Sequence, residues 1–157
     1  MTISFRDITP DNFRAVIGLK VAPDQEHFVA ANVYSLAQAR VYPGMTPAAL
    51  YAGETPVGFV MYAWEAPEYY IIRYMIAAEH QRQGYGRAAL GRLLEQFRGN
   101  PECRTVALSY EPENRVAAAL RHLGIAPRDL VVIAHTQNLE SIYTFWGAIV
   151  VGAIPSM

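Results

Sequence analysis

Cysteine, lysine and charge in general are scarce in this chain of 157 residues. Cys103 is the single cysteine, so the chain forms no internal disulfide and needs no oxidising compartment for its stability. A thiolate metal cluster is excluded for the same reason. Lys20 is the only lysine, and the other basic residues are arginines that form no stripe. With a formal net charge of −1, the composition gives no reason to expect nucleic acid as a partner.

The sequence also lacks a long hydrophobic run. Its longest uncharged apolar stretch, residues 142–154, is well short of the roughly 20 residues that span a bilayer. The first eleven residues include Arg6 and Asp7 and lack the apolar stretch of a secretion signal. The sequence therefore predicts a cytoplasmic protein with no membrane partner.

What is present describes a folded protein. The chain is 52% hydrophobic and 17% charged and contains ten tyrosines. Its length is typical of a single domain, so we expect one domain over residues 1–157. Residues 125–157 form an atypical C-terminal segment, because this apolar tail is rich in isoleucine whereas the body is rich in arginine and alanine.

The N-terminal part predicts a strand followed by two helices. Residues 2–8 alternate as in a half-buried strand, and Thr9, Pro10 and Asp11 offer an N-cap and a first-turn proline for a helix through Lys20. After Pro23, residues 24–40 resume a helical pattern. Its apolar positions recur at steps of three and four residues at Phe28, Ala31, Tyr34 or Ser35, and Ala39.

Three consecutive antiparallel strands come next, at residues 48–52, 57–64 and 69–76. Gly53-Glu54-Thr55-Pro56 provides a hairpin turn between the first two, and residues 65–68 form a polar turn before the third. The third strand is a continuous apolar run interrupted by Arg73. Residues 87–98 then predict a helix whose apolar face contains Ala89, Leu90, Leu93, Leu94 and Phe97.

The C-terminal part predicts a strand at residues 105–110 and a helix at residues 113–123, closed by Gly124. Residues 130–134 and 148–154 are candidates for two final strands. Between them, residues 138–146 form an amphipathic turn or a short helix.

A glycine-containing loop separates the third strand of the meander from its helix. The loop reads Gln81-Arg82-Gln83-Gly84-Tyr85-Gly86, and the helix follows from Arg87. Free backbone N–H groups at a helix start lie at the positive end of the helix dipole and can hold a pyrophosphate. The same string is also compatible with a simple tight turn. It is not a Walker loop, since no Gly-Lys-Ser/Thr follows Gly84, and a meander in place of a βαβ unit argues against a dinucleotide fingerprint.

These residues resemble the GNAT superfamily of N-acetyltransferases, whose signature Q/R-x-x-G-x-G/A opens a helix directly after the fourth strand. The resemblance implies an α/β fold of the α+β type. It has a mixed, mostly antiparallel sheet of six to seven strands, helices on both faces, and a cleft where a bulged fourth strand splays from the fifth. It also implies acetyl-CoA as the co-substrate. The backbone of Met75, Ile76 and Ala77 would meet its pantetheine arm, and amides from Gln81 to Arg87 would hold its pyrophosphate.

A second matching piece is Leu108-Ser109-Tyr110-Glu111-Pro112-Glu113-Asn114. The resemblance implies that Asn114 contacts the pantetheine arm, although an asparagine here is equally a helix N-cap. Segments 21–26, 34–39 and 57–62 look like the bacterial spermine/spermidine acetyltransferase subgroup.

The sequence departs from the family after Asn114. The family places a tyrosine on the following helix, where its hydroxyl protonates the departing thiolate, but here Leu120 is followed by Arg121. Tyr143 precedes Gly147 with the family's spacing and is a candidate replacement acid. The competing interpretation, which is stronger, places Tyr143 and its apolar neighbours in a core or an interface.

The resemblance implies direct attack of a primary amine on the thioester, with the N–H of Met75 or Ile76 as oxyanion donor. The fourth strand holds no carboxylate, so the general base comes from elsewhere. The candidates are Glu26, Glu65, Glu68, Glu111 and Glu113, with Glu111 and Glu26 favoured. A polyamine is the first expectation for this small-molecule acceptor, ahead of an amino acid, an aminoglycoside or a protein N-terminus.

Two other hypotheses remain. The chain is also compatible with an acyl-CoA-binding module that keeps the phosphate loop and has lost the acid. The apolar tail adds the hypothesis of a homodimer, in which residues 148–154 complete a partner's sheet. No metal is expected.

Overall fold

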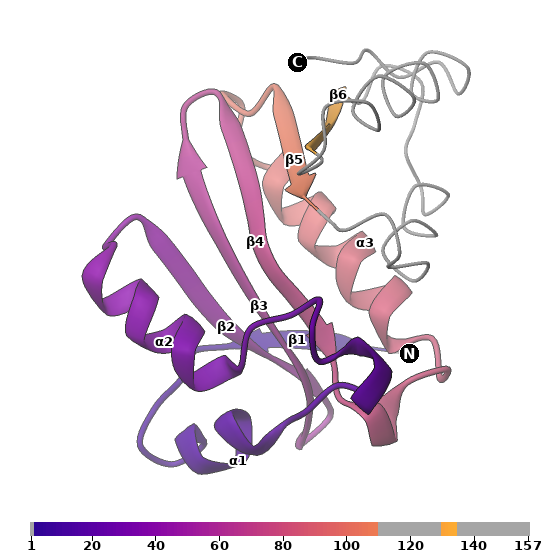
Figure 1. Cartoon of the computed structure of the whole chain (residues 1–157). Coiled ribbons are helices and arrows are strands. Elements are labelled where there is room, and N and C mark those ends of the chain that lie inside the picture. Colours follow the sequence, from indigo (N-terminus) through magenta and orange to yellow (C-terminus); the bar gives the residue numbers. More distant parts are fainter. Residues whose placement is uncertain (1, 110–129, 135–157) are drawn as a thin grey trace.

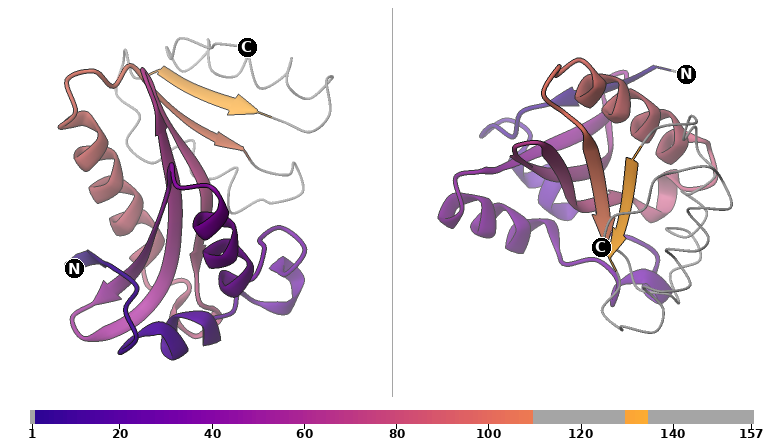
Figure 2. Two further views of the ribbon diagram at one scale, coloured as in Figure 1. Left: turned by 90° about the vertical axis from the view of Figure 1, so that its left-hand side faces the viewer. Right: turned by 90° about the horizontal axis from the view of Figure 1, so that it is seen from above.

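The computed structural model describes residues 2–109 and 130–134, and these form one six-stranded sheet with helices on both faces (Figures 1 and 2). The strands follow one another across the sheet in chain order. Strand β1 pairs with β2, β2 with β3 and β3 with β4 in antiparallel fashion. The pairs of β4 with β5 and of β5 with β6 are parallel. They are β1 Ile3–Arg6, β2 Met45–Ala52, β3 Thr55–Glu65, β4 Glu68–Ile76, β5 Thr105–Ser109 and β6 Leu130–Ala134. The mixed, mostly antiparallel sheet expected from the sequence is confirmed.

Strands β2, β3 and β4 form the predicted meander, each a little longer than expected. A two-residue turn, Gly53-Glu54, joins β2 to β3. Gly58 lies close against β4, because a Cβ added there would be 2.3 Å from the Met75 carbonyl oxygen. Only glycine fits at that position, and this tight pairing holds the C-terminal half of β4 in place.

Helix α1, Phe13–Gly18, begins later than the sequence predicted. The chain already turns at Thr9, whose carbonyl accepts from the N–H groups of Asn12 and Phe13. The Asn12 side chain accepts from the Thr9 N–H and donates to the Asp7 carbonyl. These hydrogen bonds stabilise a turn at residues 9–12, and the regular helix starts after that turn.

The prediction of one helix over residues 24–40 was wrong. The structure has a 3-10 turn, η1 Pro23–Gln25, and a separate helix, α2 Asn32–Val41. The buried Asn32 amide donates to the Val16 carbonyl of α1 at 2.9 Å, and this bond fixes where α2 starts. The predicted apolar face was partly right. Of the alternatives Tyr34 and Ser35, Ser35 is buried and Tyr34 is 59% exposed, and the inward positions of α2 are Asn32, Ser35, Leu36 and the expected Ala39.

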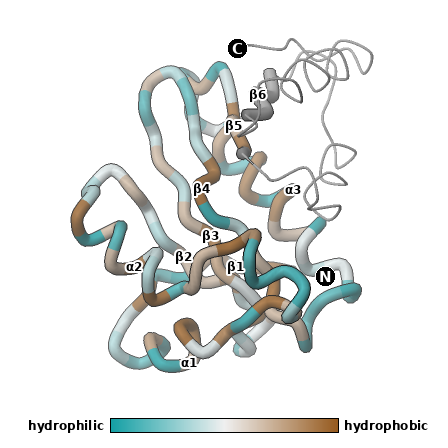
Figure 3. Tube along the Cα trace, in the orientation of Figure 1, coloured by the Kyte–Doolittle hydropathy of each residue, from teal (hydrophilic) through white to brown (hydrophobic). Residues whose placement is uncertain are grey.

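Helix α3, Tyr85–Arg98, covers one face of the sheet and begins two residues earlier than predicted. Its buried positions, Ala89, Leu90, Leu93 and Phe97, are among those expected from the sequence, and the expected Leu94 is partly buried. Polar residues alternate with these apolar positions along the helix (Figure 3). The ring of Phe97 stacks on Tyr69 of β4, with centroids 3.9 Å apart and planes 7° from parallel. This packing fixes α3 along β4 and so places the helix N-terminus beside the end of that strand.

The opposite face of the sheet is covered by α1 and α2 (Figure 2). Val16 of α1 and Leu36 of α2 pack there on Phe59, Met61 and Met75. The predicted helix at 113–123 and the predicted strand at 148–154 lie outside the described residues. Within residues 2–109 and 130–134, no helix is long and apolar enough to cross a membrane.

Candidate functional site

Strand β4 has a bulge halfway along its length. It pairs with β5 from Glu68 to Ile71 and continues to Ile76, whereas the described part of β5 ends at Ser109. Against β3, Tyr62 pairs with Ile71 and Met61 with Arg73, so Ile72 is an extra residue in β4. Such a bulge bends a strand and increases its twist. The bulge directly follows the last residue of β4 that pairs with β5, which is where the resemblance implies that the two strands splay. The splay itself stays a prediction, because the described part of β5 ends at Ser109.

Backbone donors in the second half of β4 are divided between its two sides. The Ala77 N–H donates to the Val57 carbonyl at 2.9 Å. Because neighbouring residues of a strand direct their backbone groups to opposite sides, Met75 also faces β3 while Tyr74 and Ile76 direct their backbone groups away from β3. Of the three residues expected to meet a pantetheine arm, Ile76 therefore keeps its N–H on the open side.

The loop after β4 has an unusual backbone. A 3-10 turn, η2 Ala78–His80, leads into it, and both Arg82 and Gly84 have positive φ, of 61° and 84°. Among the hydrogen bonds within the described residues, none has its donor at the backbone nitrogens of residues 82–87. These include the first N–H groups of α3, at the positive end of the helix dipole. The loop thus presents unpaired donors and two exposed cations, Arg82 and Arg87.

Gln81 anchors this loop. Its side-chain nitrogen donates to Gln25 Oε1 at 2.8 Å and to the Ile76 carbonyl at 2.9 Å. One amide thereby joins the η1 turn, the end of β4 and the start of the loop. The side chain of Gln81 is thus engaged with protein, while Gln83 donates to the Glu79 carbonyl. The sequence placed both in the loop but did not reveal these anchoring contacts.

Tyr74 adds a second anchor that sequence reasoning missed. Its hydroxyl donates to the Gly86 carbonyl at 2.5 Å and so joins β4 to the first turn of α3. Burial raises the pKa of Tyr74 well above its usual range, so the hydroxyl stays protonated and remains a donor. No motif announces this role, because Tyr74 belongs to an apolar run of ordinary strand residues.

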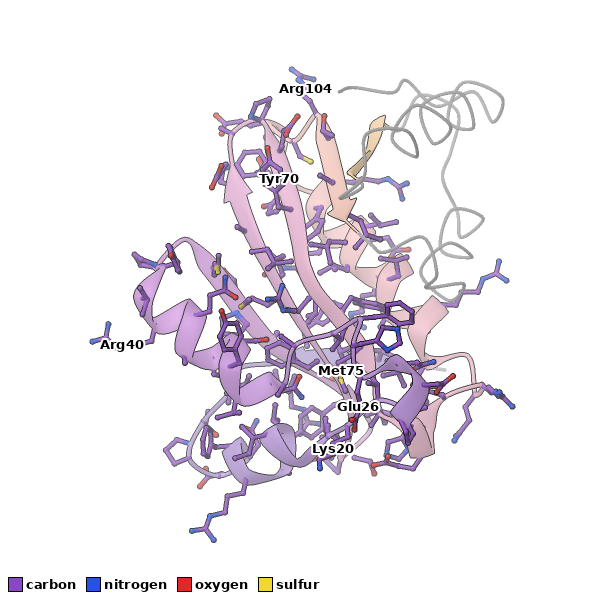
Figure 4. The ribbon with its side chains drawn as sticks, viewed as in Figure 1. Lys20, Glu26, Arg40, Tyr70, Met75 and Arg104 are labelled. Carbon is purple, nitrogen blue, oxygen red and sulfur yellow. The ribbon has the colours of Figure 1, made fainter. Side chains whose placement is uncertain are left out.

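The predicted acid and base residues are only partly placed. Glu26 is exposed and follows η1, whose Gln25 contacts Gln81, so it lies on the segment beside the loop (Figure 4). Glu111, Asn114 and Tyr143 lie outside the described residues. Their roles stay predictions.

A recess of about 410 Å³ opens on the α2 face of the sheet, between the end of α2 and the first half of β4. Tyr42 and Tyr70 stand 56% and 36% exposed around it. Its lining includes Tyr42, Met45, Ala63, Glu65, Tyr70 and the bulge residue Ile72. In Figure 4, Tyr70 lies toward the upper end of β4 and Met75 toward its lower end.

Carboxylates lie beside this recess. Glu65 and Glu68 face each other across the β3–β4 hairpin, and the Tyr70 hydroxyl donates to Glu68 Oε2 at 2.5 Å. That hydrogen bond, with the nearby negative charges of Glu68 and Glu65, raises the pKa of Tyr70. Arg73 points instead to α2, where it donates to Gln38, and its buried Nε has no partner among the described residues.

Comparisons with known proteins agree on one family. The family model described as "Acetyltransferase (GNAT) family" matches residues 5–125. The spermine/spermidine N(1)-acetyltransferase of Bacillus subtilis (strain 168) is 27% identical over 123 residues, covering 73% of this chain and 80% of that protein.

Solved structures show the same fold at low identity. The ribosomal-protein-S18-alanine N-acetyltransferase of Escherichia coli is 17% identical with a TM-score of 0.61. The match covers 77% of this chain and 75% of the Escherichia coli chain. The PaiA N-acetyltransferase of Thermoplasma acidophilum, solved with coenzyme A, is 13% identical with a TM-score of 0.55. The match covers 78% of this chain and 87% of the Thermoplasma acidophilum chain.

The described residues contain no group of three or more His, Cys, Asp or Glu side chains suited to a metal ion.

Proposed function

Because the chain belongs to the acetyltransferase (GNAT) family, as an acetyl-CoA-dependent N-acyltransferase, we propose that it acetylates a primary amine, with a polyamine as the acceptor. The observation that carries the proposal is the joint geometry of β4 and its loop. The strand bulges at Ile72 and turns the N–H of Ile76 away from β3, and residues 82–87 offer unpaired backbone donors at the end of the same strand. The polyamine is supported by the similarity to the spermine/spermidine enzyme.

The residues present fit acetyl-CoA. Backbone N–H groups of residues 82–87 would hold the pyrophosphate, with Arg82 and Arg87 exposed beside them. The pantetheine arm would lie along the splayed half of β4, where Ile76 directs its N–H outward. Bound there, acetyl-CoA supplies an activated thioester. By resemblance, Asn114 would add a contact to the arm.

The chain must then orient the amine, remove its proton and stabilise an oxyanion. An N–H on the splayed side of β4 serves as the oxyanion donor, and alternation along the strand favours Ile76 over Met75 for this task. We propose Glu26 or Glu111 as the base, directly or through water, with Tyr143 as the acid that replaces the missing family tyrosine.

The principal test combines binding with turnover. Calorimetry should detect acetyl-CoA binding, and thiol release should follow when spermidine or another amine is added. We expect Gly84→Glu to weaken coenzyme binding by at least about tenfold, because the new carboxylate lies where the pyrophosphate would bind and repels it. Gly91→Glu is the matched control, since Gly91 lies in open space further along α3. Equal affinity in the two variants would show that the loop does not bind the coenzyme.

A second candidate function is favoured by one sequence observation, the arginine that follows Leu120 where the family has its acid. A chain that binds acetyl-CoA but releases no thiol with any amine of a broad panel would be an acyl-CoA-binding module. Binding with turnover would reject this alternative.

We also propose that residues 1–157 act as one cytoplasmic domain and that the apolar tail supports a homodimer. Light scattering before and after truncation at Ser141 tests the dimer. A monomer in both cases would reject it.

A further inference from the structure

Gln81 links the end of β4 to the η1 turn, on the side of the strand where the thioester is proposed to bind. The N–H and the carbonyl of one strand residue point to the same side, so the Ile76 carbonyl faces away from β3 together with the Ile76 N–H. That carbonyl accepts from Gln81 Nε2 at 2.9 Å, and the same nitrogen donates to Gln25 Oε1 at 2.8 Å. Two consecutive hydrogen bonds therefore connect the Gln25 side chain to the backbone of Ile76.

The segment of residues 20–25 is fastened at both ends to the chain that follows β4. At one end, the Ala78 N–H donates to the Lys20 carbonyl at 2.8 Å. At the other end, Gln25 accepts from the Gln81 amide. The first bond joins two backbones, whereas the second depends on the Gln25 side chain. A substitution at Gln25 would thus release one end of the segment and leave the other end attached.

Gln25 also begins the turn that carries Glu26. The Gln25 carbonyl accepts from the Phe28 N–H at 3.0 Å, which places Glu26 and His27 at the tip of this turn. Within residues 2–109 and 130–134, the exposed Glu26 carboxylate forms no hydrogen bond and no ion pair. In Figure 4, Glu26 lies toward the same end of β4 as Met75. A general base needs a free carboxylate and a path for the proton to water, and Glu26 has both.

We propose that Gln25 is a positioning residue that, through the Gln81 amide, holds Glu26 where it removes the proton of the attacking amine. The inference rests on the proposed function, and it selects Glu26 over Glu111 as the base. Gln25 itself contacts neither the amine nor the coenzyme. Without its hydrogen bond, the turn is free to move away from β4, and Glu26 reaches the amine in a smaller fraction of the molecules.

The test measures kcat/KM for spermidine at saturating acetyl-CoA. Gln25→Met keeps the length of the side chain and removes the oxygen that accepts from Gln81. We expect it to reduce kcat/KM by about 2- to 12-fold, the equivalent of one neutral hydrogen bond, chiefly through kcat. Acetyl-CoA affinity should stay within about twofold, because Gln81 keeps its bond to the Ile76 carbonyl. Gln25→Glu retains an acceptor oxygen and should keep most of the wild-type activity.

Gln96→Met is the matched control. The Gln96 amide also donates to a side chain, the Tyr62 hydroxyl at 3.3 Å, but it lies near the C-terminal end of α3, away from the loop that precedes this helix. The control should leave kcat/KM unchanged, and melting temperatures show that each variant folds.

A double-mutant cycle shows whether Gln25 acts through Glu26. Glu26→Gln should reduce kcat by about 10²- to 10⁴-fold, the usual contribution of a general base. In the double variant, Gln25→Met should add nothing to that loss, because there is no base left to position.

The possible failures are distinct. If acetyl-CoA binds and no amine is acetylated, the proposed function fails and the inference fails with it. If amines are acetylated and Glu26→Gln keeps wild-type turnover, the base lies elsewhere and the inference alone is overturned. It is also overturned if Gln25→Met behaves like Gln96→Met, if the two losses multiply in the double variant, or if Gln25→Glu is as impaired as Gln25→Met. A loss of acetyl-CoA affinity as large as the loss of kcat/KM would show that Gln25 acts on the coenzyme loop instead.

Discussion

Replacing Gly84 and Gly91 by alanine should change stability in opposite directions, although the two glycines lie seven positions apart around the same helix. Neither substitution meets a steric obstacle, since no heavy atom lies within 4 Å of the added Cβ at either position. The difference is in the backbone. Gly84 has φ of +84° at the N-cap of α3, whereas Gly91 lies within the helix.

The magnitudes follow from this difference. An alanine held in the left-handed region costs about 1–2 kcal/mol, partly offset by about 0.4–1 kcal/mol from the less flexible unfolded chain. Gly84→Ala should therefore lose roughly 0.5–1.5 kcal/mol of stability. Gly91→Ala should gain about 0.5–1 kcal/mol, because alanine is the better helix former. Urea unfolding monitored by circular dichroism measures both, provided that the denaturant dependence is unchanged.

Coenzyme affinity provides the second measurement on the same variants. The strain at position 84 counts once, because any part that the free loop escapes by relaxing must be restored on binding and then weakens coenzyme affinity instead of stability. The losses of stability and of acetyl-CoA binding free energy in Gly84→Ala should therefore share the same roughly 1–2 kcal/mol, so the affinity should fall by at most about 5- to 30-fold. Gly91→Ala should bind normally. A Gly84→Ala variant that keeps both the stability and the affinity of the wild type would refute the reasoning.

Two further predictions concern the sheet. Gly58→Val should destabilise the protein by at least about 2–3 kcal/mol in urea unfolding, because its Cβ would overlap the Met75 carbonyl, and a neutral result would contradict the pairing of β3 with β4. The Arg6 hydrogen bond lowers the pKa of Glu54, so that pair stabilises the fold fully above the unfolded pKa of about 4.3 and loses its effect as pH falls through the folded value. The stability difference between wild type and Glu54→Gln should be constant near neutral pH and shrink on acidification; a difference that grew would count against the pair.

The sequence predicted the parts of the fold that depend on local pattern. Alternation and the Gly53 turn identified the meander, and periodicity identified the buried face of α3. The break between η1 and α2 was missed because it depends on the Asn32 amide and the Val16 carbonyl, which are sixteen residues apart. Helical periodicity continues through that break, so nothing in the pattern alone marks it.

The candidate site was likewise predictable where it is local. The spacing of Gly84 and Gly86 after a strand indicated the loop, and the left-handed conformation at Gly84 agrees with that interpretation. The anchors of the loop could not be predicted. Gln81 reaches Gln25 across 56 positions, and Tyr74 reaches Gly86 from a strand, so both contacts depend on the completed fold. The recess could not be predicted either, since its residues come from three separate strands and a loop.

The extra residue at position 72 shifts by one position the alternation of side chains between the two faces of β4. Side chains that pack toward α3 are odd-numbered before the bulge, at Tyr69 and Ile71, and even-numbered after it, at Tyr74 and Ile76. A one-residue deletion in the strand would move one of these halves to the wrong face, unless the residue removed were the bulge itself. That deletion would restore a regular strand and leave each half of β4 on its present face. A residue without a reactive group thus sets the backbone geometry of β4 at the point where the resemblance implies that the strand splays from β5.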